Sequence, residues 1–269
     1  QLVDPDSGAS LASGLVERIG EETGAITHKH GEERTEITEP VPDHGFGLSE
    51  VLRLFEEQGP SLADAHIVAV GHRVVQGGRY FSGPALIDDD VVARIEQLVP
   101  LGPLHNPAHL KGIEVGRRLL SDVPHVAVFD TAFFQDLPEE AARYALDREV
   151  ADTYSIRRYG AHGTSHQFVS GAVSELLGRD DLKQVVLHLG NGASASAVVA
   201  GHAVDTSMGL TPLEGLVMGG RTGDIDPAAV FHLARVAGMS IEEIDHLFNR
   251  GSGMKGLAGD NDMREVWKR

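Results

Sequence analysis

The sequence predicts an α/β fold made of two domains of similar size. Segments with the two-residue alternation of strands and segments with helical periodicity follow one another in both halves of the chain. The length of 269 residues is enough for about two domains. Hydrophobic residues make up 41% of the chain and charged residues 23%, as in ordinary globular proteins. We place the junction within residues 131–150, which gives domains of residues 1–135 and 136–269.

The first half combines short alternating runs, buried strands and amphipathic segments. Turn-forming residues separate the runs, and acidic residues or a proline mark helix starts. The expected elements are an antiparallel meander over 1–40, a helix over 48–57, a strand over 66–75, a helix beginning at Asp88–Asp90, a helix over 107–120 with Pro107 in its first turn, and a strand over 123–129 that ends at Asp130.

The second half begins with a glycine-rich loop that leads into an amphipathic helix over 165–177. Ser165 is the expected helix cap. The apolar stripe expected to face the core consists of Phe168, Val169, Ala172, Val173, Leu176 and Leu177. After it we expect a hairpin of strands 184–189 and 194–199, a short strand at 203–206, and helices over 226–237 and 240–248.

Charge and composition exclude several classes of protein. The 23 Lys and Arg residues against 40 Asp and Glu residues give a net charge of −17. A chain this acidic is a poor general binder of nucleic acid or anionic membrane, so we expect neither as a partner. The absence of cysteine excludes disulfides and thiolate metal sites, and it fits a reducing, cytoplasmic location. Apolar stretches fall far short of the ~20 residues of a membrane helix, and no signal peptide is visible.

Glycine is unusually frequent. The chain has 32 glycines, roughly 12% of its residues, where ~7% is typical. Many of them lie between 159 and 226, interspersed with His, Asn, Asp and Arg. This pattern indicates backbone loops that approach a ligand closely. A net-acidic protein that handles an anion must use such loops, a few placed cations or a bound metal.

Two candidate site residues stand at strand ends in the first half. Arg73 precedes the pair Gly77–Gly78 and can present two N–H groups to an anion, although a surface arginine beside a turn is the alternative. Asp130 follows a buried strand, where α/β proteins place catalytic groups. Its carboxylate could accept a proton, hold an arginine or approach Mg²⁺ through water. A turn or helix cap is the alternative for Asp130.

A histidine pair lies in the glycine-rich loop of the second half. His162 and His166 are four residues apart, a spacing that sometimes binds Zn²⁺ on a helix, and a metal hydrolase is therefore one hypothesis. His162 precedes the expected cap at Ser165, so the two rings would not share a helix face. A loop histidine that faces a developing negative charge fits better. A buried histidine that donates to a backbone carbonyl is the alternative for each.

Two further segments fit an anion site. The run from His188 to Gly192 contains an Asn-Gly pair, typical of a tight hairpin turn and also of a turn whose N–H groups face phosphate. Arg221 stands among small and polar residues, as in a loop packed on a ligand. For the nearby Asp224 and Asp226, capping of the following helix is the favoured interpretation.

Six segments, in this order, resemble motifs of one known family. They are GHRVVQGG, PLHNPAHLKGI, VAVFDTAF, RRYGAHGTSH, LHLGNGAS and DTSMGLTPLEGLVMGGRTGDIDP. The matches are long, collinear and correctly spaced, and they extend over essentially the whole chain. On this basis the sequence resembles the acetate kinase (acetokinase) family of the actin-like ATPase superfamily. The resemblance implies two ribonuclease-H-like α/β domains with a nucleotide cleft between them.

The resemblance also implies an activity. Family members transfer the γ-phosphoryl group of ATP to acetate in a reversible, Mg²⁺-dependent reaction that gives acetyl phosphate and ADP, and they form homodimers. Phosphoryl transfer depends mostly on positioning and on stabilisation of charge, for which arginines, a histidine and backbone N–H groups are suitable. A propionate or butyrate kinase of the same family is one alternative. A non-catalytic nucleotide-binding remnant of the fold is another.

Roles follow residue by residue from the matched motifs. Arg73 and Arg221 resemble the arginines that hold the carboxylate and the transferring phosphoryl group. Asp130 resembles an aspartate assigned to proton transfer, but acetate is already ionised at pH 7, which favours orientation of an arginine or of Mg²⁺. His162 resembles the transition-state histidine, supported by His166. The ATP phosphate loop matches His188, Leu189, Gly190, Asn191 and Gly192, the adenosine-side motif matches Asp262, Met263 and Arg264, and the methyl-pocket wall matches Val75, Leu104 and Pro212.

The sequence departs from the family pattern at its ends and at three positions. The family's first phosphate loop would precede Gln1, and its later adenosine loop and Mg²⁺-holding glutamate would follow Arg269. We therefore expect a fragment that lacks both ends, holds no Mg²⁺ ligand and is inactive alone. Gln76 and Gly220 replace a usual His and Thr. Ala161 replaces a usual Phe, which predicts a roomier acyl pocket.

Overall fold

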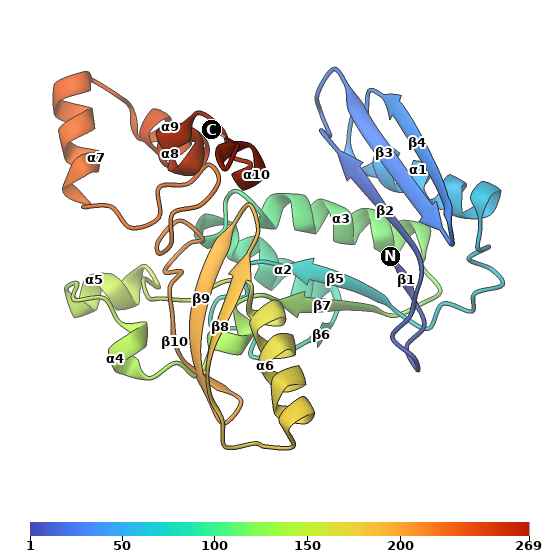
Figure 1. Cartoon of the computed structure of the whole chain (residues 1–269), viewed down its shortest axis with the longest axis horizontal. Coiled ribbons are helices and arrows are strands. Elements are labelled where there is room, and N and C mark those ends of the chain that lie inside the picture. Colours follow the sequence, from blue (N-terminus) through green and yellow to red (C-terminus); the bar gives the residue numbers. More distant parts are fainter. Residues whose placement is uncertain (269) are drawn as a thin grey trace. The chain divides into compact units, whose positions relative to one another are not determined.

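The protein has a mixed α/β fold (Figure 1). Its chain divides into two compact units. A computed structural model describes residues 1–268. The first unit contains Gln1–Arg73, Ala85–Gln97 and Leu104–Ala127, and the second contains Val74–Pro84, Leu98–Pro103 and the chain from Val128 onward. No helix within the described residues is long and apolar enough to cross a membrane.

The first unit begins with a four-stranded antiparallel sheet, which confirms the predicted meander. Its strands, in order, are β1 (Leu2–Val3), β2 (Ser10–Glu17), β3 (Gly24–His30) and β4 (Glu33–Glu39). Helix α1 (His44–Gln58) starts where the Asp43 carboxylate accepts the N–H of Phe46. Ile26, Val41 and Leu54 form the buried core of this part.

A second sheet of three strands has the order β5-β7-β6. The strands are β5 (Val70–Val74), β6 (Ala85–Leu86) and β7 (His125–Phe129). Helices α2 (Asp89–Gln97) and α3 (Asn106–Leu119) pack against each other, and a 3₁₀ turn covers Val99–Leu101. Each of these helices and the strands β5 and β7 lies where the sequence predicts it, to within a few residues.

The second unit contains an antiparallel sheet of order β10-β9-β8. Its strands are β8 (Lys183–Leu189), β9 (Ala193–Val199) and β10 (His202–Thr206), as predicted. Helix α6 (Gly163–Leu177) packs beside β8. The remaining elements are a 3₁₀ turn at Ala132–Phe134, α4 (Glu139–Ala142), α5 (Arg148–Thr153), α7 (Ala228–His232) with a π-helical continuation over Leu233–Ala237, α8 (Ile241–Arg250), α9 (Gly253–Ala258) and α10 (Met263–Val266).

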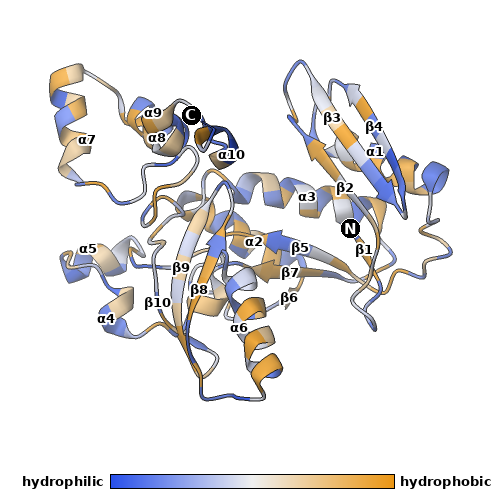
Figure 2. Cartoon of the chain, viewed as in Figure 1, coloured by the Kyte–Doolittle hydropathy of each residue, from blue (hydrophilic) through white to orange (hydrophobic). Residues whose placement is uncertain are grey.

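Two features of α6 differ from the sequence prediction. The helix begins at Gly163 rather than at 165, and His162 is its N-cap, so the prediction of Ser165 as the cap is wrong. The apolar stripe exists, but Phe168 is 75% and Leu176 83% exposed. Figure 2 shows hydrophobic colouring along both α6 and β8. Within residues 1–268 this stripe is therefore not part of a buried core, because amphipathic periodicity predicts a face but not what covers it.

A hydrogen-bonded pair of a half-buried histidine, His72, and a buried one, His125, lies within the first unit. The Leu120 carbonyl can only accept a hydrogen bond, so His125 donates to it through Nε2 at 3.0 Å. The Nδ1 of His125 then accepts the Nε2–H of His72 at 2.8 Å. Burial, and secondarily the neighbouring His125, lowers the pKa of His72 to about 4. The folded protein therefore holds His72 neutral.

We expect this pair to make stability pH-dependent. An unfolded histidine takes up a proton below a pKa of ~6.5, whereas His72 in the folded protein does so only near 4. The stabilisation is therefore complete above about pH 6.5 and is lost as the pH falls toward 4. His72→Gln keeps an N–H donor but cannot take up a proton, so its urea midpoint should fall less steeply over this range. Equal pH slopes for His72→Gln and wild type would contradict this account.

Candidate active site

The candidate site in the second unit is built on the start of α6. Gly163 donates its N–H to the Asp130 carbonyl at 3.0 Å, and a Cβ at Gly163 would lie 2.0 Å from that oxygen. Only glycine fits this approach. The Asp130 carboxylate is fully buried and accepts the His162 N–H at 3.3 Å and the Thr164 hydroxyl at 3.4 Å. These hydrogen bonds to Asp130 therefore hold in place the loop that contains His162.

The His162 ring is held on two sides. Its backbone adopts a left-handed conformation with φ 59° and ψ 20°. Its Nδ1 lies 2.9 Å from the Ser194 hydroxyl on β9. Its face stacks on His188 with ring centroids 4.1 Å apart, and His188 Nδ1 lies 2.9 Å from the Ser165 hydroxyl. The structure thus brings His162 and His188 together, and their role in facing phosphate stays a prediction.

His166 lies beneath this pair and is fully buried. Its Nε2 lies 2.8 Å from the Ser194 hydroxyl and its Nδ1 2.8 Å from the Ser196 hydroxyl. Burial, and then His188, lowers the pKa of His166 to about 4, so the ring is neutral at pH 7. Serine hydroxyls occupy both ring nitrogens, and no group of three His, Asp or Glu within the described residues could hold a metal. The zinc hypothesis therefore has no ligand set in this part of the chain.

The turn between β8 and β9 adjoins both His162 and Arg221. A Cβ at Gly192 would lie 3.3 Å from His162 Nε2 and 3.5 Å from Arg221 Nη1. A Cβ at Gly219 would lie 2.2 Å from the Asn191 Oδ1. These two glycines therefore allow close packing within the protein, and Gly192 has the side chains of His162 and Arg221 beside it. The predicted approach of these loops to a ligand stays a prediction.

Arg221 makes its hydrogen bonds to uncharged acceptors. Its Nη1 donates to the Pro212 carbonyl at 2.9 Å and to the Met218 Sδ at 3.7 Å. Burial, and then the charge of Arg250, lowers the pKa of Arg221. A cation held by neutral groups keeps its charge available for an anionic ligand. Pro212 lies beside Arg221, and the role of either residue in binding a ligand stays a prediction.

A second arginine, which sequence reasoning missed, fixes the loop before Arg221. Arg158 pairs with Glu214 at 2.8 Å, and Tyr144 donates to the same carboxylate. The Nη1 of Arg158 also donates to the carbonyls of Thr206, Ser207 and Met208, at 3.0, 3.3 and 3.3 Å. The available signal was an arginine pair beside the glycine-rich loop of a strongly acidic chain.

The other predicted site residues have local roles. Arg73 is exposed at the end of β5 and belongs to the first unit, as does Leu104, whereas Val75 is buried in the second. Asp262 caps α10 and accepts both Nε and Nη2 of Arg264 at 3.0 and 2.6 Å. These hydrogen bonds lower the pKa of Asp262 to about 2. Contact of these residues, or of Met263, with a substrate stays a prediction.

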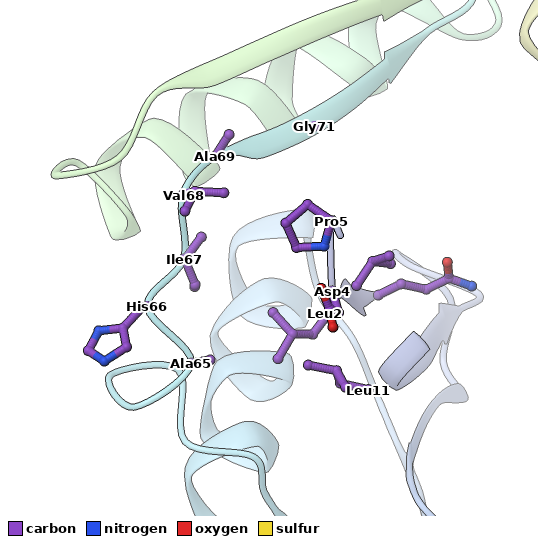
Figure 3. A pocket seen from close by; sticks show the side chains of 12 residues that line it. Leu2, Asp4, Pro5, Leu11, Ala65, His66, Ile67, Val68, Ala69 and Gly71 are labelled. Carbon is purple, nitrogen blue, oxygen red and sulfur yellow. The ribbon is translucent and has the colours of Figure 1, made fainter. Parts of the chain in front are cut away.

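A pocket of about 590 Å³ lies in the first unit, between the start of the chain and residues 65–71 (Figure 3). Its lining combines apolar side chains, such as Leu2, Pro5 and Ile67, with the polar side chains of Gln1, Asp4 and His66. None of the predicted site residues is among its lining residues.

The acetokinase family model matches residues 1–269. The chain belongs to the acetokinase family. It is 57% identical to the acetate kinase of Corynebacterium aurimucosum, covering 100% of this chain and 68% of that protein. It is also 57% identical to the acetate kinase of Streptomyces avermitilis, of which it covers 67%.

Solved structures agree with this family. A propionate kinase from Francisella tularensis superposes with a TM-score of 0.93 at 42% identity, over 99% of this chain and 68% of that one. Porphyromonas gingivalis acetate kinase gives a TM-score of 0.90 at 39% identity, again over 99% and 68%. At these identities, the similarity of this acetokinase extends to sequence as well as fold.

The contact between Gly163 and Asp130 predicts a sharp sequence requirement. In this acetokinase, Gly163→Ala places a Cβ against a backbone carbonyl, which cannot rotate away. We expect a loss of at least about 3 kcal/mol in the free energy of unfolding, at the upper end of overpacking effects. Gly171→Ala is the matched control, since it lies in the same helix with nothing within 4 Å of its Cβ. It should stabilise the helix by about 0.5–1 kcal/mol. Equal urea midpoints for the two variants would contradict the structure.

Proposed function

We propose that this protein is an acetate kinase that transfers the γ-phosphoryl group of ATP to acetate, giving acetyl phosphate and ADP. Membership of the acetokinase family supports a phosphotransferase with a carboxyl group as acceptor. The observation that carries the proposal is the convergence of His162 and Arg221 on Gly192, in a chain 57% identical to curated acetate kinases.

The proposal includes the architecture of the active site. We assign the acetate side to an N-terminal domain of residues 1–135 and the nucleotide side to residues 136–269. Both would be ribonuclease-H-like domains of the actin-like ATPase superfamily, with the nucleotide bound in a cleft. Similarity to two solved kinases supports this assignment. A cytoplasmic homodimer follows from the same resemblance and is part of the proposal.

The reaction needs no proton transfer. A carboxylate oxygen of acetate attacks the γ-phosphorus in line, one P–O bond forms, and the P–O bond to ADP breaks. Acetate is ionised at pH 7, so Asp130 has no proton to remove. In this proposal, His162 and Arg221 donate to the equatorial oxygens of the phosphoryl group, where charge is spread in the transition state. Arg73 is assigned to the acetate carboxylate, and Val75, Leu104 and Pro212 are assigned to contact with the substrate methyl group, as the resemblance implies.

The nucleotide is assigned to the turn between β8 and β9. The stretch from His188 to Gly192 supplies backbone N–H groups for the phosphates, and Asp262, Met263 and Arg264 are assigned to the adenosine side. Magnesium enters with ATP as part of the substrate. Asp130 is a single buried carboxylate engaged by the α6 start, and the described residues hold no three-ligand metal group. No step in this chain is therefore assigned to a resident metal.

Propionate is the second candidate acceptor. The structural match to a propionate kinase, with a TM-score of 0.93, supports it. The predicted widening of the acyl pocket by Ala161 does not. Ala161 is 1% exposed and packs in a cluster with Ala193, Met208 and Met218. Two long, flexible methionine side chains fill the volume beside it.

The activity is tested in an extended chain, in which residues 1–269 are flanked by the segments that the Corynebacterium aurimucosum relative has outside the matched region. We expect acetyl phosphate from ATP, Mg²⁺ and acetate, trapped as the hydroxamate. Arg73→Ala and Arg221→Ala should each lower the rate by about 10³–10⁵, as for arginines aimed at a transferring phosphoryl group. Arg179→Ala, which breaks an exposed ion pair with Asp181, is the control. An extended wild type without product would refute the function, and wild-type rates in either variant would exclude that arginine.

The packing of Ala161 predicts an effect on stability rather than on acid choice. Ala161→Phe inserts a ring into a cluster whose members are almost fully buried. We expect a loss of about 1–3 kcal/mol in the free energy of unfolding. The ratio of kcat/KM for propionate to that for acetate should stay within about twofold, well below the 10–200-fold that one methylene can give. A larger change in this ratio, without a change in the free energy of unfolding, would show that residue 161 does line the acyl pocket.

A further inference from the structure

We propose that Ser194 is a positioning residue whose hydroxyl sets the tautomer of His162, so that the Nε2 of His162 carries the proton toward Gly192 and Arg221. The inference rests on the proposed function only for the role of His162 in phosphoryl transfer. The hydrogen-bond chain that carries it stands on the geometry of the second unit alone.

Four side chains form one continuous chain of hydrogen bonds. From the interior outward, the Ser196 hydroxyl lies 2.8 Å from His166 Nδ1, and His166 Nε2 lies 2.8 Å from the Ser194 hydroxyl. The Ser194 hydroxyl lies 2.9 Å from His162 Nδ1. Ser194 and His166 are fully buried and Ser196 is 3% exposed, so water does not interrupt the chain.

The inner end of the chain determines its direction. Within the described residues, the Ser196 hydroxyl has His166 Nδ1 as its hydrogen-bond partner. If Ser196 accepted from His166, its own buried hydrogen would have no acceptor, which proteins avoid. Ser196 therefore donates, and His166 Nδ1 accepts.

Because His166 is neutral, the direction of its hydrogen bond with Ser196 also determines the direction of the next hydrogen bonds, toward His162. A neutral imidazole has one N–H, and with Nδ1 accepting, that N–H is on Nε2. His166 Nε2–H then donates to the Ser194 oxygen, and the Ser194 hydrogen points to His162 Nδ1. Because Nδ1 of His162 accepts, its proton lies on Nε2.

The result suits an anion site. His162 Nε2 and Arg221 Nη1 both adjoin the Cβ position of Gly192, at 3.3 and 3.5 Å. With a proton on Nε2, both side chains present donors to the same space. A bare Nε2 would instead be a hydrogen-bond acceptor beside the Arg221 donors and the incoming phosphoryl oxygens. Ser194 thus acts through His162 without touching the substrate.

The test measures the tautomer directly. In protein labelled with ¹⁵N-histidine, the ring nitrogen shifts of His162 at pH 7 should report Nε2–H in wild type. Ser194→Ala should convert this signal to a mixture of tautomers, and Ser196→Ala should act in the same direction, since it frees His166 to reverse. Ser165→Ala is the control, because its hydroxyl bonds His188 and not His162. A wild-type Nδ1–H signal, or an unchanged Nε2–H signal in both Ser194→Ala and Ser196→Ala, would overturn the proposal.

Kinetics of the extended chain give a second readout. Ser194→Ala should lower kcat by about 10–100-fold, less than the 10²–10³ that loss of a whole transition-state donor costs. The KM for ATP should stay within about threefold, because binding contacts are retained. A fall in kcat/KM due to KM alone would overturn the positioning role. If Ser194→Ala changes the tautomer of His162 but the extended wild-type chain makes no acetyl phosphate, the hydrogen-bond chain is supported and only the proposed function is contradicted.

Discussion

The contact between the Asp130 turn and Gly163 is the constraint on which the rest of the candidate site depends. The two backbones approach so closely that a Cβ would lie 2.0 Å from the Asp130 carbonyl oxygen. This approach starts α6 directly at the turn and forces His162 into a left-handed conformation, which costs about 1–3 kcal/mol for a residue other than glycine. Two hydrogen bonds from His162 and Thr164 to the buried Asp130 carboxylate oppose that cost.

Two arginines near this site have different electrostatic surroundings, which separates their roles. Arg158 is neutralised by Glu214 and donates to three successive carbonyls, so it holds the loop. Arg221 donates to one carbonyl and one thioether, neither of which carries charge. In a protein of net charge −17, a half-buried arginine that has no carboxylate hydrogen bond within residues 1–268 is poorly compensated unless a ligand supplies the anion. This poor compensation is the physical reason to assign Arg221, and not Arg158, to the phosphoryl group.

Sequence reasoning located the long elements, because these depend on periodicity. Motif spacing pointed to the candidate site residues, whose roles stay predictions. The meander, α3, α6 and the β8–β9 hairpin are examples. Helices α4, α5, α9 and α10 have four to six residues each, too few to show a period. Ser194 and Ser196 were missed since a serine on an alternating strand has no pattern of its own. The packing of Ala161 against Met208 depends on tertiary contacts that no local pattern encodes.

The chemistry of the proposed reaction explains why a histidine of fixed tautomer suits this site. Phosphoryl transfer between a carboxylate and ADP begins and ends with ionised oxygens, so a general acid or base has no proton to move. What lowers the barrier is a fixed set of donors aimed at the equatorial oxygens. A ring whose Nδ1 accepts a hydrogen bond from a buried serine presents the same Nε2–H in both directions of the reaction. Burial of His166, which keeps it uncharged at neutral pH, is therefore a way to keep a donor constant rather than to create a base.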